Sequence, residues 1–269
     1  MHRWSLVAAI VLIPASLAAQ TQVSRAAPDG VVFTYVRFAD IFGSQLVSAF
    51  DSIPAARYDY RPMPAQQTVG FIAQHLENAN YSLCERLGDA KRPAAVRSSL
   101  ADTLKARWPK DTLVARLRAS LDFCNAALER LPAVSTPALT ATLLGFETDL
   151  AEHYSQIAVY MRMLNLVPPS ALPPPKRTAI TLPSAALAPF VGVYALPGGI
   201  EIEVTTRDAG LFVRSNVGGE PLRLWPETAT KFFVNEVDAQ ITFTRDASGS
   251  ATGLTLHQYG RDRLGKRIR

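Results

Sequence analysis

Residues 137–164, PALTATLLGFETDLAEHYSQIAVYMRML, carry the pattern that decides the fold of the first half of the chain. Apolar side chains recur there at steps of three and four residues, which predicts a long helix with one buried face. One member of the series is missing, because His153 stands where the spacing calls for an apolar side chain. The apolar members are Leu143, Phe146, Leu150, Ile157, Tyr160 and Leu164.

A carboxylate lies one helical turn before this histidine. Asp149 and His153 are four residues apart, so their side chains project to the same face of the helix, about 6 Å apart at Cβ. The pair can share a metal ion. It can also be satisfied without one, because a lone histidine on an apolar helix face is more often a buried core residue, here with a direct hydrogen bond to the carboxylate. Both interpretations stay open from this helix alone.

A second histidine, predicted at a similar depth in the helical core, favours a metal site over a buried core histidine. Residues 68–84, TVGFIAQHLENANYSLC, have an apolar stripe at helical spacing, and His75 borders it. If the two helices face each other, His75 joins Asp149 and His153. Two histidines and one carboxylate suit a divalent transition metal with open positions for water or substrate. We therefore predict a metal site at these three residues.

Two further long helices complete the predicted helical part. The first runs from about Val36 to Ser52, where Pro54 stops it, and the other follows Asp111, which we expect to act as its N-cap. A short helix is expected between Val96 and Trp108. Four long helices with apolar stripes predict a four-helix bundle with one closed core.

The sequence pattern changes after residue 167. Residues 168–183 contain six prolines, which predicts a semi-rigid extended linker. Short runs with period two follow over residues 184–269, separated by turn residues, and predict a barrel-like antiparallel β-meander. We expect His257 to be a packing or surface residue and the basic end RDRLGKRIR (residues 261–269) to be solvated. The predicted fold class is thus α+β, with a helical domain over residues 31–167.

Three segments of the helical half carry a family resemblance. FGSQLVSAFDSIPAARYDYRPMPAQQTVG (residues 42–70), AQHLENANYSLC (residues 73–84) and EHYSQIAVYMRMLNLVPP (residues 152–169) resemble the DinB-like (YfiT-type) superfamily of four-helix bundles. The resemblance covers roughly residues 34 to 170.

In that superfamily a histidine of the second helix and an H-x-x-x-H pair of the late helix bind a metal. The matching positions are His75, Asp149 and His153, with Asp149 in place of the first histidine of the pair. The resemblance implies a divalent ion, zinc, nickel or iron, and relatives with known activities are thiol-dependent transferases or isomerases. Residues 188–269 resemble a small accessory β domain that follows serine β-lactamase-like hydrolase domains.

The N-terminal residues 1–20 have the pattern of a cleavable signal peptide. Arg3 precedes an apolar run over residues 6–13, which is too short to span a membrane, and small residues follow it. We therefore expect an exported protein, periplasmic or secreted. Export permits a disulfide between Cys84 and Cys124, which we predict, the alternative being two buried thiols.

Several function classes find no support in the residues. The chain has no S-x-x-K, no G-x-S-x-G and no glycine-rich phosphate-binding loop. The formal charge of +5 comes without a nucleic-acid-binding motif, so no nucleic acid partner is expected. Two hypotheses remain: a metal-dependent transferase or hydrolase acting on a small molecule, or a non-catalytic metal- or ligand-binding protein of the cell envelope.

Overall fold

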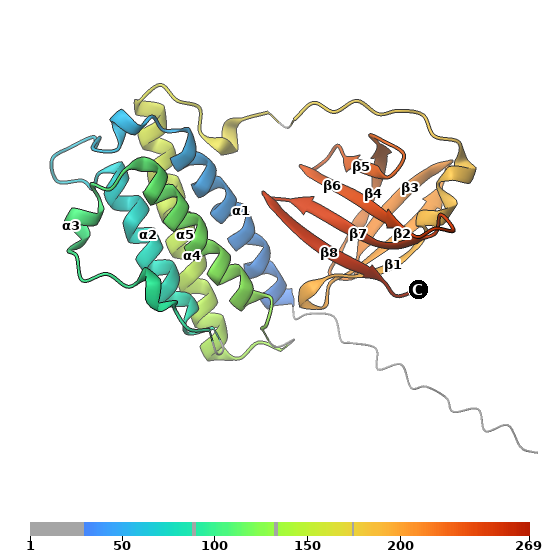
Figure 1. Cartoon of the computed structure of the whole chain (residues 1–269), viewed down its shortest axis with the longest axis horizontal. Helices are drawn as coiled ribbons and strands as arrows, with labels where there is room; N and C mark the ends of the chain where they lie inside the picture. Colours follow the sequence, from blue (N-terminus) through green and yellow to red (C-terminus); the bar gives the residue numbers. More distant parts are fainter. Residues whose placement is uncertain (1–29, 88–89, 132–133, 174) are drawn as a thin grey trace, which may run out of the picture.

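The computed structural model describes residues 30–87, 90–131, 134–173 and 175–269. The expected signal peptide, residues 1–20, lies outside the described residues. The described chain forms a helical domain followed by a β-barrel (Figure 1), as the α+β prediction required.

The helical domain is built from long helices with a short one beside them. Their bounds are α1 (Gly30–Ser52), α2 (Val69–Cys84), α3 (Asp102–Lys105), α4 (Lys110–Leu128) and α5 (Pro137–Met163). Helix α1 packs against α5, and α2 packs against α4 and α5. The stripes identified in the sequence fill the core: Leu46, Phe50, Ile72, Leu76, Leu117, Leu150 and Ile157 are fully buried.

Side-chain caps fix where two of the helices begin. The Thr68 hydroxyl accepts from the N–H of Phe71 at the start of α2, and Thr136 accepts from the N–H of Leu139 at the start of α5. The predicted cap of α4 is wrong. That helix begins one residue before Asp111, after Pro109, so the Asp111 carboxylate lies in the first turn and interacts with the helix dipole instead.

A disulfide joins two of the packed helices. Cys84, the last residue of α2, is bonded to Cys124 on α4, with the two Cα atoms 5.2 Å apart. Both residues are fully buried in the helical core. The bond closes a loop of 40 residues that contains α3.

Within residues 175–269 eight strands form a closed antiparallel barrel in sequential order, with β8 returning to β1. An aromatic cluster of Phe190, Tyr194, Phe232 and Phe243 fills its interior. The strands are β1 (Gly192–Ala195), β2 (Glu201–Arg207), β3 (Gly210–Ser215), β4 (Gly218–Pro226), β5 (Lys231–Val234), β6 (Ala239–Arg245), β7 (Ala251–Gln258) and β8 (Arg261–Arg267).

The basic C-terminal segment was expected to be solvated, and this holds for only part of it. Most of the segment is strand β8, in which Lys266 is exposed but Arg263 is buried. Arg263 lies opposite Leu256, whose side chain packs on the barrel core, so Arg263 faces the barrel interior. It is 9% exposed and pairs with Asp40 of α1, which is 5% exposed. Arg261 also pairs with Asp40, at 2.6 Å, and with Glu129 at 2.7 Å. This ionic cluster joins the barrel to the helical domain, and α1 lies on the side of the bundle facing the barrel (Figure 1).

The proline-rich segment is attached at both of its ends. Near its start the N–H of Ser170 donates to the Tyr154 hydroxyl of α5. Near its end Arg177 pairs with Asp238 and Glu227, and the N–H of Ile180 donates to the carbonyl of Pro226 in β4. The segment arches between the two domains in Figure 1.

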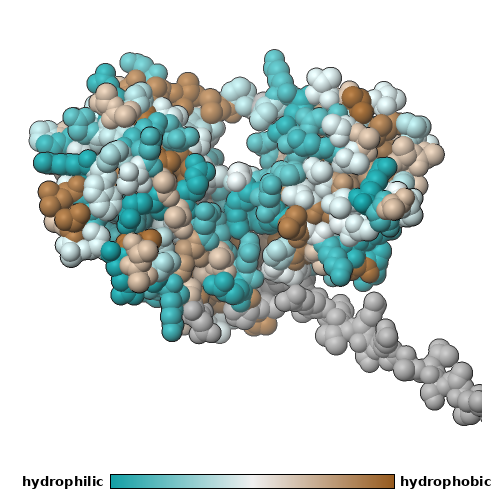
Figure 2. Space-filling view, in the orientation of Figure 1, coloured by the Kyte–Doolittle hydropathy of each residue, from teal (hydrophilic) through white to brown (hydrophobic). Residues whose placement is uncertain are grey.

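Hydrophilic side chains cover most of the face seen in Figure 2, with apolar ones in scattered patches. In the described part of the chain, no helix combines the length and the apolar character that a membrane span needs. The large apolar side chains are gathered mainly in the two separate cores, one in each domain.

Candidate metal centre

The packing of α2 against α5 brings the three predicted ligands together. The Asp149 Oδ1 atom lies 3.6 Å from Nε2 of His153 and 3.9 Å from Nε2 of His75. One donor atom from each residue can be chosen so that all three lie within 4.8 Å of one another. The two imidazole rings meet edge to face with centroids 4.9 Å apart. The three ligand atoms therefore form a triangle, with the carboxylate oxygen near both ring nitrogens.

A hydrogen-bond chain fixes the orientation and tautomer of His153. The Tyr160 hydroxyl donates to the carbonyl of Gln67 at 3.1 Å, so it accepts from the Gln156 amide nitrogen at 3.3 Å. The Gln156 oxygen then faces Nδ1 of His153 at 3.0 Å and accepts its proton. This leaves the Nε2 lone pair directed toward Asp149, which is the arrangement that metal-binding histidines use.

Asp149 has an acceptor that the described protein leaves unsatisfied. Its Oδ2 atom is buried and has no hydrogen-bond partner among the described residues. The contacts of Oδ1 with the two imidazoles, at 3.6 and 3.9 Å, are longer than hydrogen bonds. A direct hydrogen bond from Asp149 to a histidine, the metal-free alternative, is thus absent from the described geometry. An unpaired buried acceptor costs about 1–3 kcal/mol, which a cation at this position would offset.

His75 is the accessible member of the group. Its side chain is 38% exposed, whereas that of His153 is 11% exposed. The pKa of His75 is raised above its usual value, first because the Asp149 carboxylate 3.9 Å away favours the protonated ring and then because of the charges of Asp102 and Glu152, while burial acts in the opposite direction. The site is therefore negatively charged and opens toward solvent on the α2 side.

The donor set fits a divalent transition metal. Ligand atoms that share a four-coordinate zinc lie about 3.3 Å apart, since each is about 2 Å from the ion. The two carboxylate–imidazole separations of 3.6 and 3.9 Å are near that value, and all three ligand atoms lie within 4.8 Å of one another, so side-chain adjustments would bring them to it. Imidazole nitrogens with one carboxylate suit zinc, nickel and iron, and three protein ligands leave positions open.

The sequence analysis missed the residues that support the ligands. Gln156 and Tyr160 lie three and seven residues after His153 on the same helix face, a spacing that could have marked them as partners. The Gln67 carbonyl is 93 residues from Tyr160, and no local pattern points to it. Glu147 was also missed. Both of its carboxylate oxygens are buried without a partner among the described residues, and burial raises its pKa to about 7.

His257 lies apart from this centre, on the barrel. His257 was expected to be a packing or surface residue, and β7 and β8 place Asp262 opposite it, with the Oδ1 atom of Asp262 2.6 Å from Nδ1. The hydroxyl of Thr242 lies 2.9 Å from Nε2. Both ring nitrogens are thus occupied within the sheet, and His257 is a satisfied surface residue.

Comparison with known proteins identifies both halves of the chain. Residues 42–157 match the family model described as the DinB superfamily, and residues 176–267 match a domain of unknown function, DUF3471. No curated protein matches. The chain is similar to a solved structure described as the crystal structure of SurE with D-Leu, at 22% identity and a TM-score of 0.30. That match covers 45% of this chain and 28% of the other. The helical domain of this chain belongs to the DinB superfamily, and a β-barrel domain follows it.

Proposed function

We propose that the helical domain binds a divalent metal ion, zinc, nickel or iron, through His75, Asp149 and His153, and acts on a small molecule as an exported metal-dependent transferase or hydrolase. The observation that carries the proposal is the position of the Asp149 carboxylate. One of its oxygens lies near two imidazole nitrogens without hydrogen-bonding to either, and the other is buried without a partner among the described residues.

The chemistry follows from the roles of the residues. A divalent ion at this site would act as a Lewis acid that activates water or a substrate thiol. Gln156 holds His153 in the tautomer whose Nε2 atom is free to bind, and Asp149 supplies negative charge beside both rings. His75 is partly exposed, so a small molecule can approach from its side. The proposal of export is supported by the buried disulfide and by the signal-peptide pattern of residues 1–20.

Substitution of Asp149 tests this proposal. We expect Asp149→Ala to weaken zinc binding by an order of magnitude or more, because it removes one of three ligands. Asp149→His restores a three-histidine set and is expected to retain or tighten binding of zinc or nickel. Calorimetric titration of the purified protein measures both. Asp122→Ala, which changes an exposed carboxylate on α4, is the matched control and should bind as the wild type does.

Two results of these titrations would contradict the proposal. If neither the wild type nor Asp149→His shows saturable binding, the three residues are structural and the metal-dependent function is wrong. If Asp149→Ala binds as tightly as the wild type, the ion is held elsewhere in the chain.

A further inference from the structure

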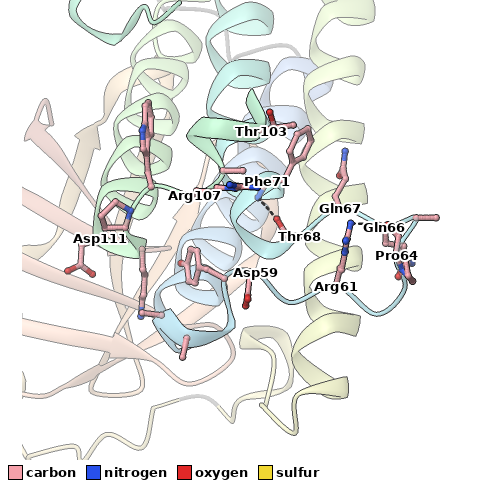
Figure 3. A pocket seen from close by; sticks show the side chains of 18 residues that line it. Asp59, Arg61, Pro64, Gln66, Gln67, Thr68, Phe71, Thr103, Arg107 and Asp111 are labelled. Carbon is pink, nitrogen blue, oxygen red and sulfur yellow. Dashed lines mark hydrogen bonds between the residues drawn. The ribbon is translucent and has the colours of Figure 1, made fainter. Parts of the chain in front are cut away.

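A second feature of the helical domain has the form of a ligand-binding cavity. It has a volume of about 1090 Å³ and lies at the N-terminal end of α2, between the loop over residues 55–68 and the segment that joins α3 to α4 (Figure 3). Phe71 and Trp108 provide apolar surface in its wall. The Arg116 guanidinium lies 4.8 Å from the ring centre of Trp108 and holds that ring in place.

In the described chain, three basic side chains line the cavity, and they differ in their hydrogen bonds. The Arg61 guanidinium donates to the Pro64 carbonyl, and the Lys110 ammonium donates to the Asp51 carbonyl. The Arg107 guanidinium is exposed and has no hydrogen bond or ion pair within the described residues. Figure 3 shows Arg107 beside Phe71 and Thr103, with Asp111 at the opposite edge. Arg107 is thus the lining cation whose side-chain donors are all free within the described residues.

The backbone at the start of α2 is not available to a ligand. The N–H groups of Val69 and Gly70 donate to the carbonyls of Tyr60 and Tyr58, and the N–H of Phe71 donates to Thr68. Gly70 also allows α2 to approach the α3–α4 segment closely, because a Cβ atom there would overlap the Ala106 carbonyl oxygen. Recognition of an anion therefore depends on side chains, and chiefly on Arg107.

None of the three metal ligands lines the cavity, but two lining residues are linked to them. Phe71 precedes His75 by one turn of α2, so the two side chains project from the same face of the helix. Gln67, another lining residue, accepts from the Tyr160 hydroxyl that begins the hydrogen-bond chain to His153. Arg107 is an exposed lining cation without a carboxylate partner among the described residues, so the anionic end of a ligand is favoured there.

We propose that this cavity binds a small organic acid with an aromatic body, whose carboxylate pairs with Arg107 and whose ring packs on Phe71 and Trp108. We further propose that the ligand extends its neutral end past Phe71 toward His75 and is the substrate of the metal centre. The second statement rests on the proposed function, whereas the first does not.

The first statement is tested on the full-length processed protein after treatment with a chelator. We expect 1-naphthylacetate to bind saturably in calorimetry, and both acetate and the neutral analogue 2-(1-naphthyl)ethanol to bind at least fivefold more weakly. Arg107→Gln should weaken binding of 1-naphthylacetate about fivefold or more, since it removes a charge-assisted hydrogen bond. Arg97→Gln is the matched control, because Arg97 is exposed and lies outside the cavity lining. Binding unchanged by Arg107→Gln, or equal binding of the neutral analogue, would overturn the assignment.

The second statement is tested with the same protein loaded with cobalt. We expect 1-naphthylacetate to change the visible spectrum of the bound cobalt, with half-saturation at the concentration found by calorimetry. A spectrum that does not change while the acid saturates the cavity separates the cavity from the metal centre and overturns the substrate assignment alone. Failure of cobalt to bind overturns the proposed function and the substrate assignment together, while binding of the acid in the chelator-treated protein still supports the cavity.

Discussion

Asp40→Ala is expected to lower the free energy of unfolding by about 3–5 kcal/mol, the usual result of removing one partner from a buried ion pair. Asp40 is 5% exposed and Arg263 is 9% exposed. Arg261 retains Glu129 after the substitution, but the Arg263 guanidinium has no other ion-pair partner among the described residues. A buried, unpaired guanidinium would remain at the contact between α1 and β8, and this contact should weaken first.

Denaturant unfolding followed at two sites measures this effect. Trp108 reports on the helical domain and Trp225, in β4, reports on the barrel, so single-tryptophan variants distinguish the two. We expect the two transitions to separate in Asp40→Ala. Asp51→Ala, an exposed carboxylate on the same helix, is the control and should change stability by less than about 0.5 kcal/mol. A loss of similar size in both variants would show that the Asp40 cluster does not couple the domains.

Removal of the disulfide is expected to have an effect of similar size. In the chain-entropy account, closing a loop of 40 residues stabilises the fold by about 4 kcal/mol, because it restricts the unfolded chain. The double substitution Cys84→Ala and Cys124→Ala should therefore lower the stability of the helical domain by that amount, with a smaller further loss from the truncated buried side chains.

The two tryptophan signals should respond unequally to this change. Because both cysteines lie in the helical core, the Trp108 transition is expected to move further than the Trp225 transition, which loses only the contribution of the Asp40 cluster. Thiol titration of the unfolded, unreduced wild type should find no free thiol among the described residues. Two titratable thiols in protein from an oxidising compartment would contradict the disulfide.

The sequence predicted those parts of the fold that local periodicity determines. The stripe around Leu150 and Ile157 defined α5 to within one residue at its C-terminal end, because helical spacing of apolar side chains is a local property. The period-two runs likewise predicted the antiparallel strands that close into the barrel. The same helical spacing placed Asp149 and His153 on one face of α5, and the packing of α2 on α5 added His75.

The features that the sequence did not predict depend on long-range contacts. Asp40 and Arg263 are 223 residues apart, and nothing in the basic segment distinguishes a paired arginine from a solvated one. The predicted N-cap role of Asp111 is wrong for a local reason. Pro109 is the N-cap residue of α4, so Asp111 already lies inside the first turn of the helix. The orientation of Gln156 beside His153 depends on the Tyr160 hydroxyl, which donates to the Gln67 carbonyl. That carbonyl is 93 residues away in the sequence and meets Tyr160 only in the folded bundle.

The central claim is that His75, Asp149 and His153 hold one divalent ion. The most direct test is anomalous diffraction from crystals of the zinc-loaded protein, collected on both sides of the zinc absorption edge. We predict one strong anomalous peak about 2 Å from Nε2 of His75, Nε2 of His153 and a carboxylate oxygen of Asp149. Crystals grown with excess zinc that show no peak at these three residues would contradict the account.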